Sequence, residues 1–338
     1  MLILKYIFIL FGDGVLSTDG SFVNSSAYPY RVILYVGLVI ILVYFFVKSQ
    51  TRSLYKTKRL LKEKEQALDL IARQKIALEL KDKDITDSLN YAQRIQEALL
   101  PSELYFRNHF EGSFIFFKPK NIVSGDFYWI GENEDKVFVV AADCTGHGIP
   151  GALLSMIGLE IIEKTINEDH IETPSKILAV LNKELEKTFS SEKNIGTIIH
   201  DGMDIGLSVV DKKRKILEYA GAFFPLYLIR NNNLIEIKGD KLIIGMNKEG
   251  FSYTDHVMDL MEGDIFYMFS DGYADQFGGS QNRKFMYRRF RYLLLTIHNF
   301  SFDDQKSILD ENIKTWMGRN VQVDDIMVIG FRPLDSRI

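Results

Sequence analysis

The chain has 338 residues, of which 25% are charged, and a net charge of −4. This length allows one sizeable domain plus accessory segments, and the acidic balance lacks the basic character of nucleic-acid-binding proteins, so no nucleic-acid partner is expected. The single cysteine, Cys144, excludes an internal disulfide framework and favours a reducing compartment for the part that contains it. Because there is no CxxC pair, a zinc site built on paired thiolates is not expected.

An unbroken apolar run extends from Val32 to Val47, between Arg31 and Lys48. At about 1.5 Å per residue the run is slightly short for a bilayer core, but the flanking basic side chains can reach the interfaces. A buried core helix is the alternative for a run of this length. The many lysines and arginines at positions 48–64 favour a cytoplasmic location for everything that follows. We therefore expect a single-pass protein of the inner (cell) membrane.

This interpretation divides the N-terminal part into three segments. Residues 1–30 are expected to be a short N-terminal, extracytoplasmic segment, in which residues 2–11 leave a signal-like function open. Residues 31–48 are the predicted transmembrane helix. Residues 49–100 are the predicted linker, because Leu38 to Leu100 contains neither Gly nor Pro and so favours one continuous helix.

The linker carries apolar residues at intervals of seven, with one shift of frame; they are Leu54, Leu61, Leu68, Ile71, Leu78 and Ile85. This spacing is typical of a coiled coil with an interrupted register. A solvated single helix is the alternative. Since one apolar stripe cannot bury itself, we expect a parallel homodimer through this segment.

Past Pro101, short β-rich runs alternate with amphipathic helices. Strands are predicted at residues 113–117, 136–142, 203–210, 215–220, 226–230, 234–238, 264–269 and 325–331, and helices at residues 150–166, from 174 onward, 285–298 and 302–317. Ser301 is the expected cap of the last helix. Hairpin strands followed by grouped helices favour an α+β layered sandwich over a parallel βαβ sheet.

Acidic side chains recur beside the predicted apolar strands. They are Asp126, Asp143, Asp271 and the pair Asp324-Asp325. An aspartate directly after an apolar strand projects at the edge of the sheet, so four such groups can converge. Clustered carboxylates repel one another, and hard divalent cations such as Mg²⁺ or Mn²⁺ relieve that repulsion. A single Asp-Gly is usually only a turn, so the prediction of a two-metal site that activates water rests on all four occurring together.

The motifs around these residues resemble the type 2C metal-dependent protein phosphatases, and specifically their bacterial SpoIIE-like branch. The resemblance covers roughly residues 114–331, and its motifs are Ser-Gly-Asp126-Phe-Tyr, Asp143-Cys-Thr-Gly-His-Gly-Ile-Pro-Gly-Ala, Ser-Asp271-Gly-Tyr-Ala-Asp275 and Asp324-Asp325-Ile-Met-Val-Ile. It implies a four-layer α-β-β-α sandwich for residues 101–338. It also implies hydrolysis of phosphoserine or phosphothreonine on a regulatory protein, such as an anti-sigma-factor antagonist, with two divalent metal ions (Mn²⁺ or Mg²⁺) that activate a water molecule.

The resemblance also implies a role for each matching residue. Asp143 would bridge the two metals and Asp126 would bind one of them, and both would be catalytic. The remaining ligands would be the Cys144 carbonyl, Asp271 and Asp324, while Asp325 would support the ligands. Gly146, Gly148 and Gly272 would let the backbone approach the metals closely.

Other positions are less well defined by the motifs. His147 is a candidate general acid toward the leaving oxygen. The arginine that binds phosphate in eukaryotic relatives has no evident match, and Lys118 and Lys120 are weak candidates for that role. Asp201 and Asp204, in the sequence Asp-Gly-Met-Asp, either contact a further metal or only form a turn and the start of a strand.

Two other functions compete with the phosphatase. A diguanylate cyclase would also combine a span, a helix and a Gly-Asp-Phe turn, but it gives Asp324 no role. A catalytically inactive, phosphatase-like scaffold is the second alternative, and the presence of all four aspartates argues against it.

If the enzyme is active, the helix entering the domain near residues 91–100 offers a route by which a rotation or a change in the dimer reaches the active site.

Overall fold

A computed structural model describes residues 28–110, 112–189, 201–246 and 252–334. The chain divides into two compact units, Met1–Lys83 and Asp84–Ile338. Most of the predicted N-terminal segment, including residues 2–11, lies outside the described residues.

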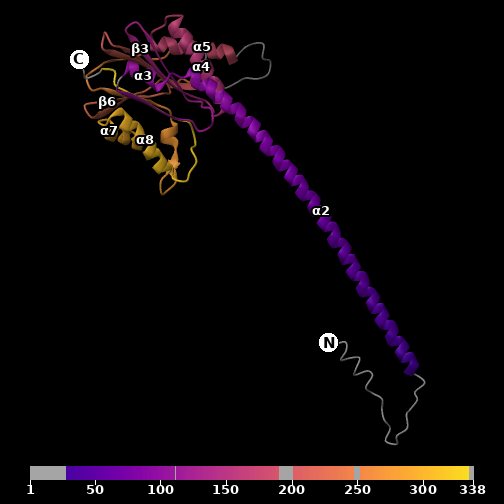
Figure 1. The fold of residues 1–338 in the computed structure, drawn as a ribbon. Helices are drawn as coiled ribbons and strands as arrows, with labels where there is room; N and C mark the ends of the chain where they lie inside the picture. Colours follow the sequence, from indigo (N-terminus) through magenta and orange to yellow (C-terminus); the bar gives the residue numbers. More distant parts are fainter. Residues whose placement is uncertain (1–27, 111, 190–200, 247–251, 335–338) are drawn as a thin grey trace. The chain divides into compact units, whose positions relative to one another are not determined.

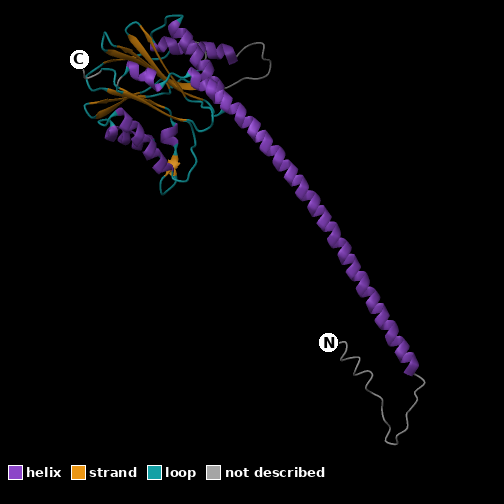
Figure 2. Ribbon diagram, viewed as in Figure 1, coloured by secondary structure: helices purple, strands orange, loops and turns teal. Residues whose placement is uncertain are grey.

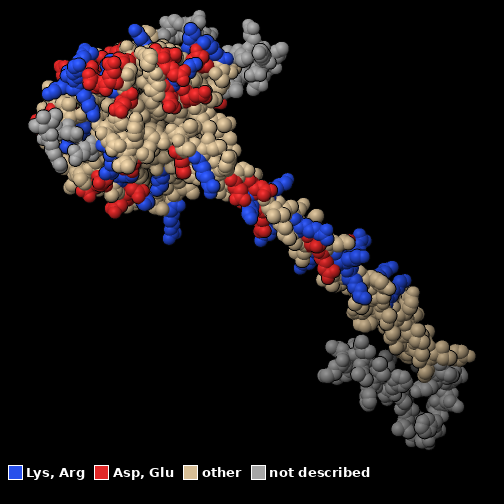
Figure 3. Space-filling model, turned by 45° about the horizontal axis from the view of Figure 1, so that its top comes forward, with Lys and Arg blue, Asp and Glu red and all other residues tan. Residues whose placement is uncertain are grey.

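The first unit is described from the start of helix α2 (Tyr28–Leu99), which is 72 residues long. It is the continuous helix that the absence of Gly and Pro predicts. The apolar side chains at its beginning are exposed, with Ile40 at 62% and Phe46 at 65%, and Figure 3 shows them as a tan stretch followed by many blue basic side chains. An 18-residue window here has a mean hydropathy of 2.4 and no part of it is buried.

This exposure excludes a buried core helix as the explanation of the apolar run within the described residues. By length and composition α2 could cross a membrane. The heptad residues Leu54, Leu61 and Leu68 are exposed as well, so no described part of the single chain covers their stripe. The homodimer stays a prediction.

The second unit is built around two five-stranded antiparallel sheets. One, the β12 sheet, has the order β1 (Ser113–Lys118), β12 (Ile326–Phe331), β9 (Ile265–Phe269), β6 (Leu226–Arg230) and β7 (Asn233–Ile237). The other, the β3 sheet, has the order β2 (Phe127–Asn133), β3 (Lys136–Cys144), β4 (Met203–Asp211), β5 (Ile216–Ala222) and β8 (His256–Asp259). A small hairpin joins β10 (Phe277–Gly278) to β11 (Arg283–Lys284).

Helices cover the outer face of each sheet, as Figures 1 and 2 show. Those on the β3 sheet are α4 (Ile149–Asn167) and α5 (Pro174–Phe189), and those on the β12 sheet are α7 (Tyr287–Ile297) and α8 (Phe302–Met317). Two short helices, α3 (Glu103–His109) and α6 (Gly272–Asp275), lie beside the strands that they precede or follow. The predicted four-layer α-β-β-α sandwich is confirmed.

The alternation of side chains along the strands creates separate cores on the two faces of a sheet. In β3, Phe138 and Val140 pack with α4 and α5, whereas Val139 and Ala141 face the β12 sheet. A third core joins the outer face of the β12 sheet to α7 and α8, where Phe290 is fully buried. Because both faces of each sheet are buried, the strands keep a fixed register and hold their end residues in fixed positions.

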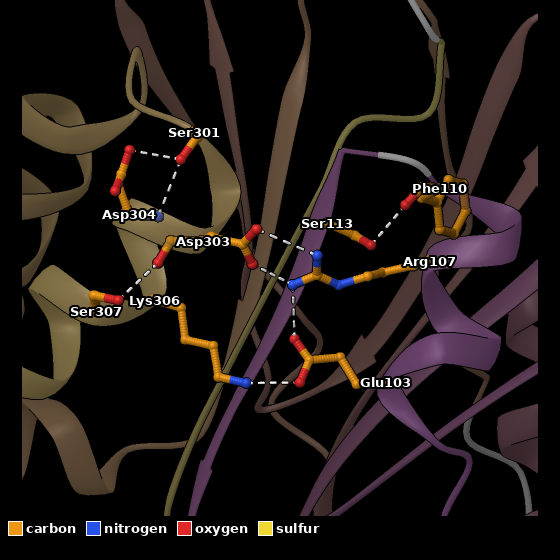
Figure 4. A network of polar contacts seen from close by, with 9 residues as sticks. All are labelled: Glu103, Arg107, Phe110, Ser113, Ser301, Asp303, Asp304, Lys306 and Ser307. Atoms are coloured by element: carbon orange, nitrogen blue, oxygen red, sulfur yellow. Dashed lines mark hydrogen bonds and ion pairs between the residues drawn. The ribbon is translucent and has the colours of Figure 1, made fainter.

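Polar contacts attach α3 to α8 (Figure 4). The Glu103 carboxylate lies 2.7 Å from the Lys306 ammonium and 3.1 Å from the Arg107 guanidinium. Arg107 also pairs with Asp303 of α8. The Ser301 hydroxyl accepts a hydrogen bond from the Asp304 amide at 3.1 Å, which confirms it as the cap of α8. These contacts connect the segment that follows α2 to the outer layer of the domain.

Some elements differ from the sequence-based expectation. Helix α8 begins and ends at the predicted residues, but strands β2 and β8 and helices α3 and α6 were not predicted. Strand β2 contains Gly131 and ends in polar residues, so its pattern is weak. Asp126 was expected directly after a strand, but because β2 begins at Phe127, Asp126 lies directly before one.

Candidate active site

Three aspartates lie at one end of the β3 sheet. Asp126 directly precedes β2, Asp143 is the penultimate residue of β3, and Asp204 is the second residue of β4. Neighbouring strands are antiparallel, so the start of β2, the end of β3 and the start of β4 share this end. Asp143 and Asp204 are direct partners in the register, which places their side chains on the same face of the sheet.

The β12 sheet contributes two further positions in the same way. Asp271 follows β9 and precedes α6, while Asp324 and Asp325 precede β12. Strands β9 and β12 are antiparallel neighbours, so these residues also share one end of their sheet. Gly272 permits the close approach of the two segments, because a Cβ at this position would lie 1.9 Å from the Asp325 carbonyl oxygen.

Electrostatics show that the two groups of carboxylates face one another. Burial, followed by repulsion from Asp143, raises the pKa of Asp126 well above its usual range. Burial, followed by repulsion from Asp271, Asp324 and Asp204, does the same to the pKa of Asp143. Burial and neighbouring carboxylates also raise the pKa of both Asp204 and Asp271 to about 6. The aspartates predicted from distant motifs thus form one mutually repelling cluster.

This donor set fits divalent cations by its chemistry. Carboxylate oxygens are the preferred ligands of Mg²⁺ and Mn²⁺, and positive charge would relieve the repulsion that raises the pKa values. Among the described residues, no group of three His, Cys, Asp or Glu side chains already stands in a ready-made ligand arrangement. The charge and the donor atoms of the cluster therefore fit the ions.

Asp325 holds the loop that carries Asp126. Its two carboxylate oxygens accept hydrogen bonds from the backbone amides of Lys120, at 2.6 Å, and Gly125, at 2.7 Å. Both oxygens of this buried side chain are used in this way, so Asp325 fixes the position of the backbone just before Asp126.

Ser270 is a site residue that the sequence did not reveal. Its hydroxyl donates to Asp126 at 2.5 Å and accepts from the Met327 amide at 3.0 Å. It therefore orients Asp126 from across the two sheets. The signal was present in the Ser-Asp271-Gly motif, but only the tertiary structure shows the partner.

The loop after β3 holds the other predicted residues. Gly146 and Gly148 have φ values of 82° and 70°, a conformation that other residues rarely adopt. His147 between them is exposed, and its Nδ1 lies 3.0 Å from the Asn121 side-chain oxygen. The Cys144 side chain is buried in the core between the β3 sheet and its helices, and burial, more than the nearby carboxylates, raises its thiol pKa well above the usual value. Cys144 is therefore no nucleophile.

The two lysines that were candidates for phosphate binding, Lys118 and Lys120, make contacts with other acidic residues. The Lys118 ammonium is 3.6 Å from the Asp310 carboxylate of α8, and Lys120 contributes its backbone amide to Asp325. Lys284 of β11 also acts on the cluster: its positive charge partly offsets the rise in the pKa of Asp271, and it pairs with Asp275 at 2.6 Å. Sequence reasoning missed it because Lys284 lies outside the four motifs.

The last turn of α2 contacts the Asp126 loop. Gln96 is 4% exposed, and its side-chain amide binds the Ser124 carbonyl at 2.7 Å and the Ser155 hydroxyl at 3.0 Å. Its side-chain oxygen accepts from the Ser124 amide at 3.1 Å. The Ser124 hydroxyl in turn accepts from the Asp126 amide at 3.1 Å. A chain of hydrogen bonds thus leads from the helix to Asp126.

The fold and the aspartate cluster define a PP2C-like α-β-β-α sandwich, and comparisons with known proteins agree. The chain shares 33% identity and a TM-score of 0.68 with the SiaA-PP2C domain of Pseudomonas aeruginosa, over 75% of this chain and 98% of that domain. A structure of the PP2C phosphatase domain and a regulatory fragment of SpoIIE from Bacillus subtilis is similar in fold, with 18% identity and a TM-score of 0.52 over 65% of this chain and 62% of that one.

The sequence profile described as Stage II sporulation protein E (SpoIIE) matches residues 133–333. The chain therefore belongs to the SpoIIE family. It is also 25% identical over 196 residues to the phosphoserine phosphatase RsbU of Bacillus subtilis (strain 168), which covers 57% of this chain. The match spans 55% of the length of that relative.

Proposed function

We propose that this protein is a metal-dependent protein serine/threonine phosphatase. The observation that carries the proposal is the convergence of Asp126, Asp143, Asp204, Asp271 and Asp324 into one acidic cluster. Burial, followed by repulsion from neighbouring carboxylates, raises the pKa values of Asp126, Asp143, Asp204 and Asp271 within it. A protein that only bound a partner would gain nothing from buried like charges, which are costly unless compensated. The similarity to a phosphoserine phosphatase supports the same reaction class.

The proposed division of labour follows the positions of the residues. Asp143, with Asp126, Asp271, Asp324 and the Cys144 carbonyl, would hold two divalent ions, and Asp204 extends the acidic set beside Asp143. When bound, Mn²⁺ or Mg²⁺ would activate water and neutralise the charge of the phosphoryl group.

The surrounding residues position these ligands. Ser270 and Asp325 keep Asp126 and its loop in place through the hydrogen bonds described above. His147 is exposed and hydrogen-bonded to Asn121, so it is accessible to donate a proton to the leaving serine oxygen.

We further propose that the enzyme acts in membrane-linked signalling. Helix α2 would anchor it as a single-pass inner-membrane protein with the catalytic domain in the cytoplasm, and its heptads would form a parallel homodimer. Because Gln96 at the end of α2 bonds to the Asp126 loop, a change in the helix would change the metal site. The substrate would be a phosphorylated regulatory protein, such as an anti-sigma-factor antagonist.

A cheap assay separates this function from the alternative of an inactive scaffold. The full chain in detergent should hydrolyse p-nitrophenyl phosphate with Mn²⁺, lose the activity with EDTA, and release phosphate from phosphoserine and phosphothreonine peptides. A properly folded protein that hydrolyses none of these substrates with Mn²⁺ or Mg²⁺ would refute the enzyme and favour the scaffold.

A further inference from the structure

A pocket with a volume of about 980 Å³ opens between β11, the length of α7 and Asn312 of α8. Four basic side chains line it, and no acidic residue does; they are Arg283, Lys284, Arg288 and Arg289. Aromatic and apolar groups complete the wall, among them Phe285 and Tyr292. None of these residues belongs to the aspartate cluster.

The arginines differ in how they are held. The Arg289 guanidinium lies 4.6 Å from the centre of the Trp316 ring and donates to the carbonyls of Lys284 and Phe285. Within the described part of the chain, these contacts hold Arg289 in place without a carboxylate partner. Arg283 and Arg288 are exposed and have no ion pair among the described residues. Three guanidinium groups thus keep their positive charge available to a ligand.

The position of these charges is unfavourable for helix stability. Helix α7 has no acidic residue in its first turn and no side-chain cap, and Arg288 and Arg289 lie at the positive end of its dipole. Acidic side chains are the stabilising choice there. Residues that oppose the stability of their own helix are expected mainly at functional positions. A bound anionic ligand would neutralise the repulsion between these arginines and the positive end of the helix dipole.

The pocket adjoins the acidic cluster through two connections. Lys284 lines the pocket, pairs with Asp275 and acts on Asp271. The backbone amides of Phe285 and Met286 donate to the carbonyls of Gln276, at 2.9 Å, and Ala274, at 2.7 Å, which ties the pocket to α6 directly after Asp271. A peptide whose phosphorylated residue lay at the cluster would therefore pass close to the pocket.

We propose that this pocket docks an acidic segment of the phosphoprotein substrate that flanks the phosphorylated serine or threonine. The inference rests on the proposed phosphatase function and adds the substrate class. Arginine clusters recognise carboxylates through forked hydrogen bonds, and the aspartate cluster repels any acidic segment that is not held on a basic surface. The pocket thus lets the enzyme accept an acidic substrate although its own net charge is −4.

Binding tests the pocket independently of catalysis. A fluorescein-labelled acidic peptide with an unphosphorylated serine is titrated with the full chain in detergent and read by anisotropy. The same peptide with Gln and Asn in place of Glu and Asp should bind at least about tenfold more weakly, and added salt should remove the difference. Equal affinity for the two peptides would overturn the proposal, as would tight binding of single-stranded RNA or anionic vesicles with no binding of the acidic peptide.

Charge reversal locates the interaction. The Arg283→Glu/Arg288→Glu variant should lose about tenfold in affinity for the acidic peptide, which corresponds to two partly exposed ion pairs and their reversal. The matched control Lys164→Glu/Lys183→Glu makes the same charge change at exposed positions of α4 and α5 and should bind as the wild type does. Arg283→Gln/Arg288→Gln serves if the reversed variant does not fold. Loss in the control, or unchanged binding by both pocket variants, would contradict the assignment.

Kinetics separate the two proposals. With Mn²⁺, the pocket variants should raise KM for an acidic phosphopeptide about tenfold and leave the hydrolysis of p-nitrophenyl phosphate unchanged. Turnover without preference for acidic peptides would refute the docking site and leave the phosphatase standing. Specific binding of the acidic peptide without any turnover would refute the phosphatase and leave the docking site standing.

Discussion

Replacing Gln96 by leucine should loosen the Asp126 loop. The change removes the three hydrogen bonds that the Gln96 side chain makes with Ser124 and Ser155. Each such bond contributes about 1 kcal/mol net, and each buried partner left unpaired costs about 1–3 kcal/mol. Undocking of the helix end would let water reach the Ser124 backbone and limit the loss. We therefore expect the free energy that favours the docked helix end over the undocked one to fall by about 2–4 kcal/mol in the variant.

Hydrogen exchange measures this loss directly. A change of 2–4 kcal/mol corresponds to a roughly 30- to 1,000-fold increase in local opening. The Ser124 and Asp126 amides should exchange faster by that factor in Gln96→Leu, while core amides of β3 stay unchanged. The control is Gln93→Leu, since the Gln93 side chain donates a hydrogen bond to the exposed Glu97 of the same helix, at 3.0 Å, and such pairs contribute about 0.2–0.5 kcal/mol.

The same variant tests whether the helix influences metal binding. A looser Asp126 loop should raise the Mn²⁺ concentration needed for half-maximal phosphatase activity by about 10- to 100-fold, as the loss of supporting contacts does at metal sites. If Gln96→Leu exchanges at Ser124 as slowly as the wild type, the Gln96 hydrogen bonds do not hold the Asp126 loop. If exchange accelerates while the Mn²⁺ requirement stays the same, α2 tethers the domain without controlling the site.

Three further predictions concern the cluster and its surroundings. Asp143→Asn should lower Mn²⁺-dependent turnover at least about 100-fold, yet raise the melting temperature in EDTA because it removes a repelling buried charge; full turnover would contradict the metal-bridge assignment. Ser270→Ala should weaken Mn²⁺ activation about tenfold by freeing Asp126, whereas Ser270→Thr should restore it if the hydroxyl alone matters. Hydrogen bonding to Arg107 lowers the pKa of Asp303, so this pair stabilises the fold above the usual aspartate pKa and loses its effect as the pH falls through the lowered value. Arg107→Ala should therefore cost up to about 1 kcal/mol in denaturant titrations at pH 7 and progressively less toward pH 3; an equal cost at both pH values would show that packing, not charge, is lost.

The sequence by itself determined the fold class and most of its elements. Periodicity and turn residues placed most of the strands near their observed positions, and the run without Gly or Pro from residue 38 onward determined most of α2. These signals are local: they depend on the spacing of apolar residues and on the dihedral preferences of a few residue types. The same local signals led us to miss β2, where Gly131 weakens the pattern, and to describe Asp126 as following a strand.

Only the tertiary structure decided how the acidic residues meet. In antiparallel sheets the end of one strand lies beside the start of the next, so Asp126 and Asp204, which begin strands, join Asp143 and Asp271, which end them. No spacing rule in the sequence reveals that Asp204 is the register partner of Asp143, because pairing depends on which strands become neighbours. The sequence therefore pointed to the chemistry of the site, while strand pairing selected its members.

The supporting residues depend on tertiary structure even more strongly. Gln96 lies within the predicted linker helix, and Ser270 precedes Asp271 in its motif, yet both bond to segments far away in the chain. Contacts over such separations leave no local pattern, since their energy comes from burial and hydrogen-bond geometry that exist only in the folded protein.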